Sequence, residues 1–156
     1  MGEVFLKVNI AKQILKLYQG NSFQQSYPIS TSKFGLGSEP NSFKTPLGWH
    51  VIAKKIGEGL PAGAVLRSRE WTGAIWNFED PYQSDEDLVL SRILWLDGVE
   101  PSNRTSFERY IYIHGTNQEY EIGTPASHGC VRMKNQDIIE LFDKIPEGTK
   151  VNLVEN

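Results

Sequence analysis

The chain has 156 residues, of which 39% are hydrophobic and 22% are charged, and its formal net charge is −3. This size and composition are typical of one globular domain that buries its own core, so residues 1–156 are expected to form a single domain. The weak negative charge argues against a nucleic-acid partner. The lack of basic runs and of long apolar runs argues against a membrane partner.

The first twenty residues do not have the pattern of an export signal. They lack a basic segment followed by an unbroken apolar segment and a small-residue cleavage site. If the chain is complete, it is therefore expected in the cytoplasm; if a leader has been removed, it belongs in the periplasm or the cell envelope. The lone cysteine, Cys130, fits a reducing compartment, although a single thiol also survives export.

Apolar and polar residues alternate in short runs along most of the chain. This period-2 pattern predicts strands at residues 3–10, 13–18, 22–30, 48–57, 88–98, 109–115 and 150–155. Residues 31–46 are rich in Ser, Gly, Pro and Asn and predict a loop. Residues 57–87 form a long irregular segment, which is either functional or contains an element that the pattern does not reveal.

Residues 135–145 contain the one clear helical pattern. Asn135 is expected to be its N-cap, and Pro146 with Gly148 is expected to end it. The apolar face has the spacing i, i+3, i+4 and i+7, with Ile138, Leu141, Phe142 and Ile145. The sequence therefore predicts a mostly β domain with one main helix.

The lone thiol stands in the stretch SHGCVRM, residues 127–133, among polar neighbours that a buried structural cysteine rarely has. In residues 109–115 the alternation places His114 at the end of a strand, on the face opposite Ile111 and Ile113. An imidazole can take the proton of a thiol, which leaves a nucleophilic thiolate beside an imidazolium. Backbone N–H groups just before Cys130, where Gly129 allows close approach, would stabilise an oxyanion. Residue chemistry thus favours a cysteine-nucleophile enzyme.

Two other interpretations of these residues stay open. A single cysteine or histidine is most often structural. A zinc site could draw on His50, His114, His128 and Cys130, but no CxxC or HExxH spacing is present, so no metal or other cofactor is expected.

Arginines are the candidate contacts for anionic groups of a substrate. Alternation after Cys130 places Arg132 on the same face, where it would bind a carboxylate or, with equal weight, form a structural ion pair. Arg92 and Arg104 are weaker candidates. Among the tryptophans, Trp71 and Trp76 are the candidates for substrate contact because they lie in the irregular segment.

The motif His114-Gly115-Thr116 followed by Ser127-His128-Gly129-Cys130-Val131-Arg132 resembles the signature of the L,D-transpeptidases, the YkuD-type catalytic domain. The segment KTPLGWHVI, residues 44–52, resembles the amino-terminal half of that family, and the likeness to its short single-domain members extends over nearly the whole chain. The resemblance implies a β-sandwich with one main helix and a lid over the active site, which we expect within residues 57–87.

The resemblance also implies an activity and roles for the residues of the motif. Family members act on peptidoglycan stem peptides that end in D-Ala: the cysteine attacks the carbonyl of the third residue, usually diaminopimelate, and expels D-Ala to leave a thioester. By position, Cys130 would be the nucleophile and His114 the base, with the carbonyl of Gly115 orienting its ring. His128 and Gly129 would shape the oxyanion hole, and Arg132 and Ser127 would contact the substrate.

The acyl acceptor in this family is an amine of another stem peptide, a lipoprotein lysine or water. Without a leader, water is the expected acceptor, which predicts an L,D-carboxypeptidase that trims tetrapeptides or muropeptides during murein recycling. One alternative is an exported transpeptidase that forms 3–3 cross-links or exchanges D-amino acids, and another is a non-catalytic module that binds stem peptides. The resemblance further implies acylation by carbapenems.

Overall fold

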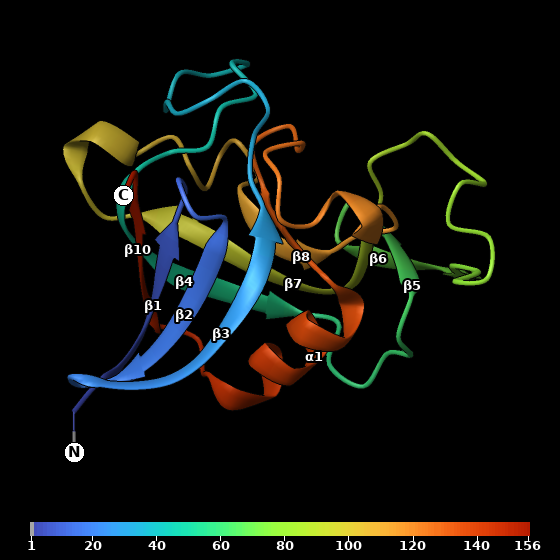
Figure 1. Ribbon diagram of the computed structural model, residues 1–156, viewed down its shortest axis with the longest axis horizontal. Coiled ribbons are helices and arrows are strands. Elements are labelled where there is room, and N and C mark those ends of the chain that lie inside the picture. The colour runs from blue at the N-terminus through green and yellow to red at the C-terminus, as the bar shows by residue number, and fades with distance from the viewer. Residues whose placement is uncertain (1) are drawn as a thin grey trace.

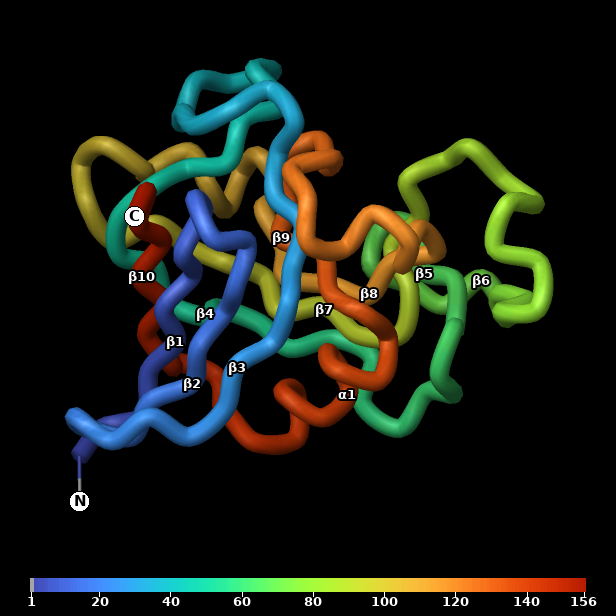
Figure 2. The backbone as a smooth tube through the Cα atoms, in the orientation of Figure 1, coloured from blue at the N-terminus to red at the C-terminus, as the bar shows by residue number. Residues whose placement is uncertain are grey.

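The computed structural model describes residues 2–156, and β-strands dominate it (Figures 1 and 2). The strands are β1 Val4–Asn9, β2 Ile14–Gln19, β3 Ser22–Ser30, β4 Gly48–Ile56, β5 Ala64–Arg67, β6 Glu70–Ile75, β7 Val89–Gly98, β8 Tyr112–Gly115, β9 Val131–Met133 and β10 Lys150–Val154. One α-helix, α1 Asn135–Lys144, and two single 3-10 turns, Pro101–Asn103 and Glu119–Glu121, complete the secondary structure. The prediction of a mostly β fold with one main helix is confirmed.

All ten strands belong to one hydrogen-bonded sheet, in the order β4-β10-β1-β2-β3-β9-β8-β7-β5-β6. Because β4 also pairs with β7, the strands from β4 round to β7 close on themselves. The two sides of the expected sandwich are thus joined by hydrogen bonds at both margins, as in a barrel. Only the hairpin β5–β6 stands outside the closed part, at the right of Figure 1.

The core lies inside the closed sheet and under α1. Alternate residues of the strands point inward, and α1 packs against β7 and β8. The fully buried side chains of this core include Leu6, Val8, Leu94, Ile113, Val131, Met133, Ile138 and Leu141. Each such side chain stabilises the fold by about 1.5–3 kcal/mol relative to an exposed one.

The short strands β8 and β9 run parallel, with Ile113 opposite Val131 and His114 opposite Arg132. Ile111 and Ile113 are buried in the core, as the alternation predicted. The side chains on the other face of these two strands therefore point away from the main core. This arrangement places the histidine and the cysteine of the sequence motif side by side in the fold.

The structure adds strands that the periodicity did not reveal. β8 begins only at Tyr112, because Tyr110 adopts a left-handed backbone conformation with φ of 57°. β9 has three residues, too few to show a period. Residues 57–87 are not irregular throughout: β5 and β6 form a hairpin whose turn, Ser68-Arg69, lacks the Asn-Gly or Asp-Gly pair that usually signals one.

The helix begins one residue earlier than predicted, since Lys134 and not Asn135 is the N-cap and Asn135 is the first helical residue. The buried Asn135 amide donates to the carbonyl of Thr116 at 2.8 Å and to Glu119 Oε2 at 2.9 Å. Its Oδ1 accepts from Ser91 Oγ at 2.6 Å. Asn135 therefore joins the helix to β7 and to the chain that leaves β8. Among residues 2–156 no helix has the length and apolar character needed to cross a membrane.

Replacing Asn135 by Ala should lower the free energy of unfolding by about 2–3 kcal/mol, because several buried hydrogen-bonding groups lose their partner together. Urea unfolding measures the change. Gln136→Ala, at the exposed next position of α1, is the matched control and should leave stability nearly unchanged. Equal stability of the two variants would contradict the proposed role of Asn135.

Candidate active site

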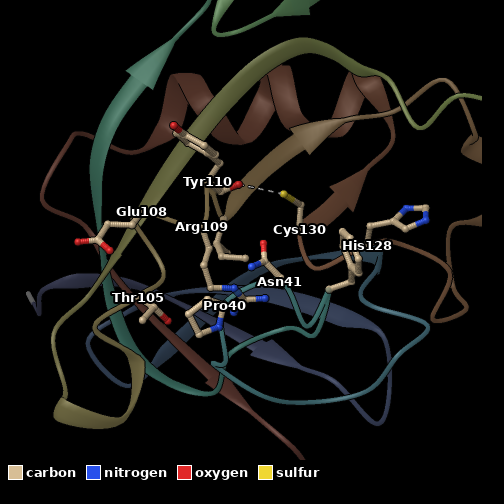
Figure 3. A pocket seen from close by; sticks show the side chains of 10 residues that line it. Pro40, Asn41, Thr105, Glu108, Arg109, Tyr110, His128 and Cys130 are labelled. Atoms are coloured by element: carbon tan, nitrogen blue, oxygen red, sulfur yellow. Dashed lines mark hydrogen bonds between the residues drawn. The ribbon is translucent and has the colours of Figure 1, made fainter.

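The thiol of Cys130 is held by the backbone of the neighbouring strand. The half-buried Cys130 Sγ accepts from the N–H of Tyr112 at 3.3 Å. It donates to the carbonyl of Tyr110 at 3.3 Å (Figure 3). The left-handed backbone of Tyr110 is an uncommon state for a residue other than glycine. This conformation interrupts the extended backbone at Tyr110, the residue whose carbonyl accepts from the thiol.

One cavity is lined by this thiol, and a second is lined by the two tyrosines whose backbones hold it. One, of about 340 Å³, is lined by Cys130 itself and by residues that include Asn41, Phe43, Arg109, Tyr110 and His128 (Figure 3). The other, of about 290 Å³, is lined by the hairpin turn and by residues that include Arg69, Tyr110 and Tyr112. Tyr110 is common to both. The β5–β6 hairpin thus stands where the resemblance led us to expect a lid.

His114 is buried at the end of β8, and its ring orientation is set by its own strand. Nδ1 donates to the carbonyl of Gly115 at 2.6 Å, which leaves Nε2 with the lone pair. Burial lowers the pKa of His114, against the opposing influence of Asp87 and Gly115. The imidazole is therefore neutral at physiological pH, as a general base must be. No hydrogen bond joins His114 to Cys130 within residues 2–156, so any transfer between them requires substrate binding or a small movement.

The thiol is also neutral at rest. Burial raises the pKa of Cys130 to about 12, and the N–H of Tyr112 offsets only part of this effect. A neutral thiol beside a neutral imidazole differs from the thiolate–imidazolium pair that residue chemistry suggested. In this arrangement the proton has to move as the sulfur attacks.

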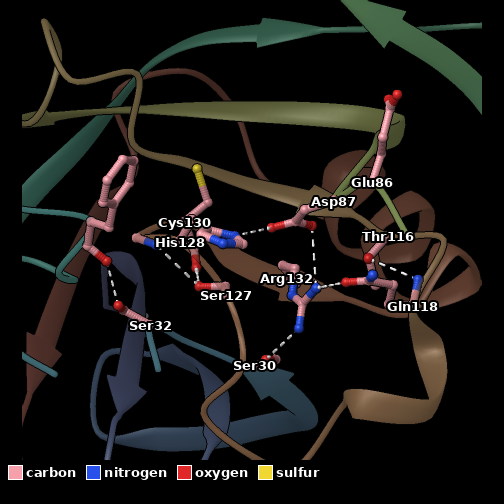
Figure 4. Close-up of polar contacts among 12 residues, drawn as sticks. Ser30, Ser32, Glu86, Asp87, Thr116, Gln118, Ser127, His128, Cys130 and Arg132 are labelled. Atoms are coloured by element: carbon pink, nitrogen blue, oxygen red, sulfur yellow. Dashed lines mark hydrogen bonds and ion pairs between the residues drawn. The ribbon is translucent and has the colours of Figure 1, made fainter. Parts of the chain in front are cut away.

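The loop before Cys130 is braced by hydroxyl groups. Ser127 Oγ donates to the carbonyl of Cys130 at 2.7 Å and accepts from the N–H of Gly129 at 3.3 Å (Figure 4). Thr45 Oγ1 donates to the carbonyl of Gly129 at 2.9 Å. Gly129 has φ of 125°, and a Cβ there would lie 3.3 Å from the carbonyl of Lys44, so glycine is required.

These contacts bear on two of the expected roles. Ser127 is fully buried, so the structure places it as a brace for the loop and not against a substrate. An oxyanion role for the N–H of Gly129 requires that its bond to Ser127 open. Thr45 explains why the Thr-Pro segment accompanies the cysteine motif.

Arg132 is fully buried, and both terminal nitrogens of its guanidinium already have partners, whereas its Nε has none. Nη1 donates to Asp87 Oδ1 at 3.2 Å and to Gln118 Oε1 at 2.6 Å, and Nη2 donates to Ser30 Oγ at 3.1 Å (Figure 4). Nη2 also donates to Glu121 Oε1 at 2.9 Å. The geometry favours the structural ion pair over direct contact with a substrate.

Asp87 is a site residue that sequence reasoning missed. It accepts from Arg132 and, at 3.2 Å, from Nδ1 of the half-exposed His128. Burial acts to raise the pKa of Asp87, but interactions with His114, Arg132 and His128 lower it below its ordinary value. Asp87 is the last residue of the segment 57–87. That segment contains several acidic residues, and no sequence pattern distinguishes Asp87 from the others. His128 lies beside the rings of Phe34 and Phe43, at 5.9 and 6.0 Å.

The other predicted contacts lie elsewhere. Arg92 is buried over the ring of Phe142 and donates to the carbonyls of Leu60 and Ser91. Arg104 is exposed and lines neither cavity. The same holds for Trp71 on β6, whereas Trp76 is buried in a small apolar cluster. The arginines that line the cavities are Arg109 in the larger one and Arg69 in the smaller one.

The four residues considered for zinc do not form one cluster, because His50 lies apart from the other three. His50 bonds to the carbonyl of Gly48 and to Ser106 Oγ, away from the motif. Within residues 2–156 no three side chains of His, Cys, Asp or Glu are grouped so that they could hold a metal ion.

The pKa of Cys130 predicts how the thiol reacts with an alkylating agent. In the native protein, alkylation by iodoacetamide should rise about tenfold per pH unit from neutral pH upward without levelling off, because the thiolate fraction keeps rising. In denaturant the rate should level off near the ordinary thiol pKa of about 8.5. Mass spectrometry of the single cysteine gives both profiles. A native plateau near or below neutral pH would show a resting thiolate.

The burial of Arg132 predicts a stability effect. Arg132→Met should lower the free energy of unfolding by about 3 kcal/mol, because it leaves Asp87 and Glu121 without their cation. Arg67→Met is the control: this exposed arginine pairs with Glu86 at 3.1 Å, and its loss should cost less than about 1 kcal/mol. Urea unfolding compares them. Near-wild-type stability of Arg132→Met with a raised KM would favour a substrate contact instead.

Similar proteins have longer chains. The ErfK/SrfK protein of Salmonella typhimurium is 47% identical over 152 residues, which are 95% of this chain and 43% of that protein. YkuD of Bacillus subtilis is 28% identical over 149 residues, 95% of this chain and 64% of that protein. Both names include L,D-transpeptidase. The chain spans less than two thirds of the length of these relatives.

Solved structures agree in fold. An L,D-transpeptidase from Xylanimonas cellulosilytica superposes with a TM-score of 0.63 at 20% identity, over 98% of this chain and 61% of that one. A cysteine-to-serine mutant of the Enterococcus faecium L,D-transpeptidase gives 0.61 at 17% identity, over 99% and 50%. The sequence model of the protein family described as the L,D-transpeptidase catalytic domain, YkuD, matches residues 3–153. With that match over nearly its whole length, the chain belongs to the L,D-transpeptidase catalytic-domain family.

Proposed function

We propose that this protein is a cysteine enzyme that removes D-Ala from peptidoglycan stem tetrapeptides. The observation that carries the proposal is the position of the thiol: Cys130 lines a cavity, and the register of β8 and β9 puts His114, which is buried and does not line that cavity, on the same face of these strands. His114 donates from Nδ1 to Gly115, so its Nε2 is the nitrogen available to accept a proton. The family supports the choice of substrate.

Acylation follows from these neutral groups. The thiol proton passes to Nε2 of His114 as the sulfur bonds to the carbonyl carbon of the third stem residue. The tetrahedral intermediate then collapses, the bond to the nitrogen of D-Ala breaks, and His114 returns the proton to that nitrogen. D-Ala leaves, and a thioester on Cys130 remains.

Water is the proposed acceptor. His114 takes a proton from a water molecule, the resulting hydroxyl attacks the thioester carbon, and the sulfur leaves with the proton to restore the thiol. Each cavity beside the thiol is small, at about 340 and 290 Å³. Once the acyl group fills part of this space, the room that D-Ala vacates suits water better than a second peptide. The protein is then an L,D-carboxypeptidase suited to murein recycling in the cytoplasm.

A transpeptidase of the cell envelope is the alternative. It uses the same acyl-enzyme and differs only in deacylation by an amine. Recovery of the native protein from the envelope fraction of its cells would favour it. In either case carbapenems should acylate Cys130; one structural neighbour, LdtMt1, is solved in complex with imipenem.

The test uses a diaminopimelate tetrapeptide, with and without a second stem peptide, and follows the products by mass spectrometry. A tripeptide whose yield is unchanged by the acceptor supports the carboxypeptidase, whereas a cross-linked product or exchanged D-amino acid supports the transpeptidase. Cys130→Ala should abolish acylation, and His114→Gln should slow it about 10³-fold or more.

The matched control is His128→Gln, which changes the exposed histidine two residues from the thiol and should retain most of the acylation rate. The reverse result, with normal acylation in His114→Gln and none in His128→Gln, would overturn the assignment of the base. Full activity of Cys130→Ala would overturn the proposal.

A further inference from the structure

Two arginines on the β5–β6 hairpin have different surroundings. Arg67 is exposed and its Nη2 pairs with Glu86 Oε2 at 3.1 Å. Arg69, two residues later, forms no ion pair with Asp or Glu within residues 2–156. Its hydrogen bond goes to an uncharged group, since Nη1 donates to the hydroxyl of Tyr112 at 3.2 Å. The next residue, Glu70, interacts with Arg69 electrostatically but forms no ion pair with it within residues 2–156.

The guanidinium of Arg69 is held over aromatic rings. Its Cζ lies 4.9 Å from the ring centre of Tyr110 and 5.2 Å from that of Trp95. Aromatic faces attract a cation but do not neutralise it. A guanidinium has five N–H groups, so the bond to Tyr112 leaves donors that an anion could use.

The backbone holds Arg69 in this place at a cost. Ser68 and Arg69 both have left-handed conformations, with φ of 48° and 67°, which glycine would adopt more easily. The hairpin joins the barrel through only two residue pairs, Val65 with Leu90 and Leu66 with Val89. Val65 and Leu66 are also buried against the barrel, so the hairpin is anchored at its base, and the turn that aims Arg69 at the rings is its tip.

The cavity under this tip adjoins the thiol. Arg69, Tyr110 and Tyr112 line it, and the backbones of the two tyrosines hold Cys130 Sγ. Cys130 also packs against the cluster of Leu66 and Tyr112. An anionic group bound to Arg69 would therefore lie beside the two tyrosines whose backbones hold the thiol.

We propose that Arg69 is the receptor for a carboxylate of the stem peptide and makes the enzyme selective for substrates in which that carboxylate is free. The inference rests on the proposed function, which supplies a substrate with two such groups: the carboxyl terminus of D-Ala and the side-chain carboxylate of diaminopimelate. The fork of a guanidinium matches either one with two parallel hydrogen bonds. The aromatic contacts to Tyr110 and Trp95 keep the fork in place.

The experiment compares kcat/KM for three tetrapeptides: one with both carboxylates free, one amidated at the carboxyl terminus and one amidated on the diaminopimelate side chain. For the wild type, amidation of the recognised carboxylate should reduce kcat/KM about 10- to 100-fold. Arg69→Ala should lose a similar factor on the free acid and almost nothing on that amide. Arg69→Lys, which keeps the charge without the fork, should fall between. The amide that shows the effect identifies the carboxylate.

Arg67→Ala is the matched control on the same hairpin and should act like the wild type on all three peptides. If Arg69→Ala slows the three peptides by the same factor, Arg69 merely holds the hairpin down and the inference fails while the proposed function stands. Equal use of all three peptides by the wild type would likewise overturn the inference and leave the proposed function standing. If the wild type releases D-Ala from none of them, the proposed function and the inference both fail.

Discussion

Parallel hydrogen bonding between β8 and β9 brings His114 and Cys130 onto one outward face of the barrel. The pairing is short, and Ile113 opposite Val131 anchors it because both side chains are buried in the core. A slip of one residue would turn an arginine into that core and the apolar side chains outward. The register of two short strands therefore determines the chemistry of the site.

The neutral and the permanently charged groups on this face are separate residues, and burial affects both sets. The groups proposed to react, the thiol and the imidazole, are both neutral when no substrate is present. The permanent charges lie beside them in the buried pair of Arg132 and Asp87. When charge develops during a reaction, charges that are already fixed in place need no further reorganisation free energy. A preorganised site lowers the activation barrier in this way. Cation and carboxylate thus support the site without having to touch a substrate.

Most of the strands and the helix could be predicted from the sequence, because alternating and i, i+3, i+4 patterns report which side chains face a core. The elements that could not be predicted, β5, β6 and β9, are too short or lack a marked turn. The motif around Cys130 was visible because its residue types are unusual neighbours for a thiol. The roles of Asp87 and Arg69 could not be predicted, because the role of an acid or an arginine in a loop depends on tertiary contacts that the sequence pattern does not report. For Arg132 the sequence left two interpretations open, and only burial separates them.

The raised pKa of the Cys130 thiol affects how fast oxidants react with it. Peroxides attack thiolates far faster than thiols, and enzymes with a resting thiolate are readily oxidised to the sulfenic acid and beyond. A cysteine that keeps its proton until a carbonyl arrives offers such oxidants little to react with. The 156 residues contain no second cysteine that could form an intramolecular disulfide, so the neutral state of the Cys130 thiol is what would limit its oxidation.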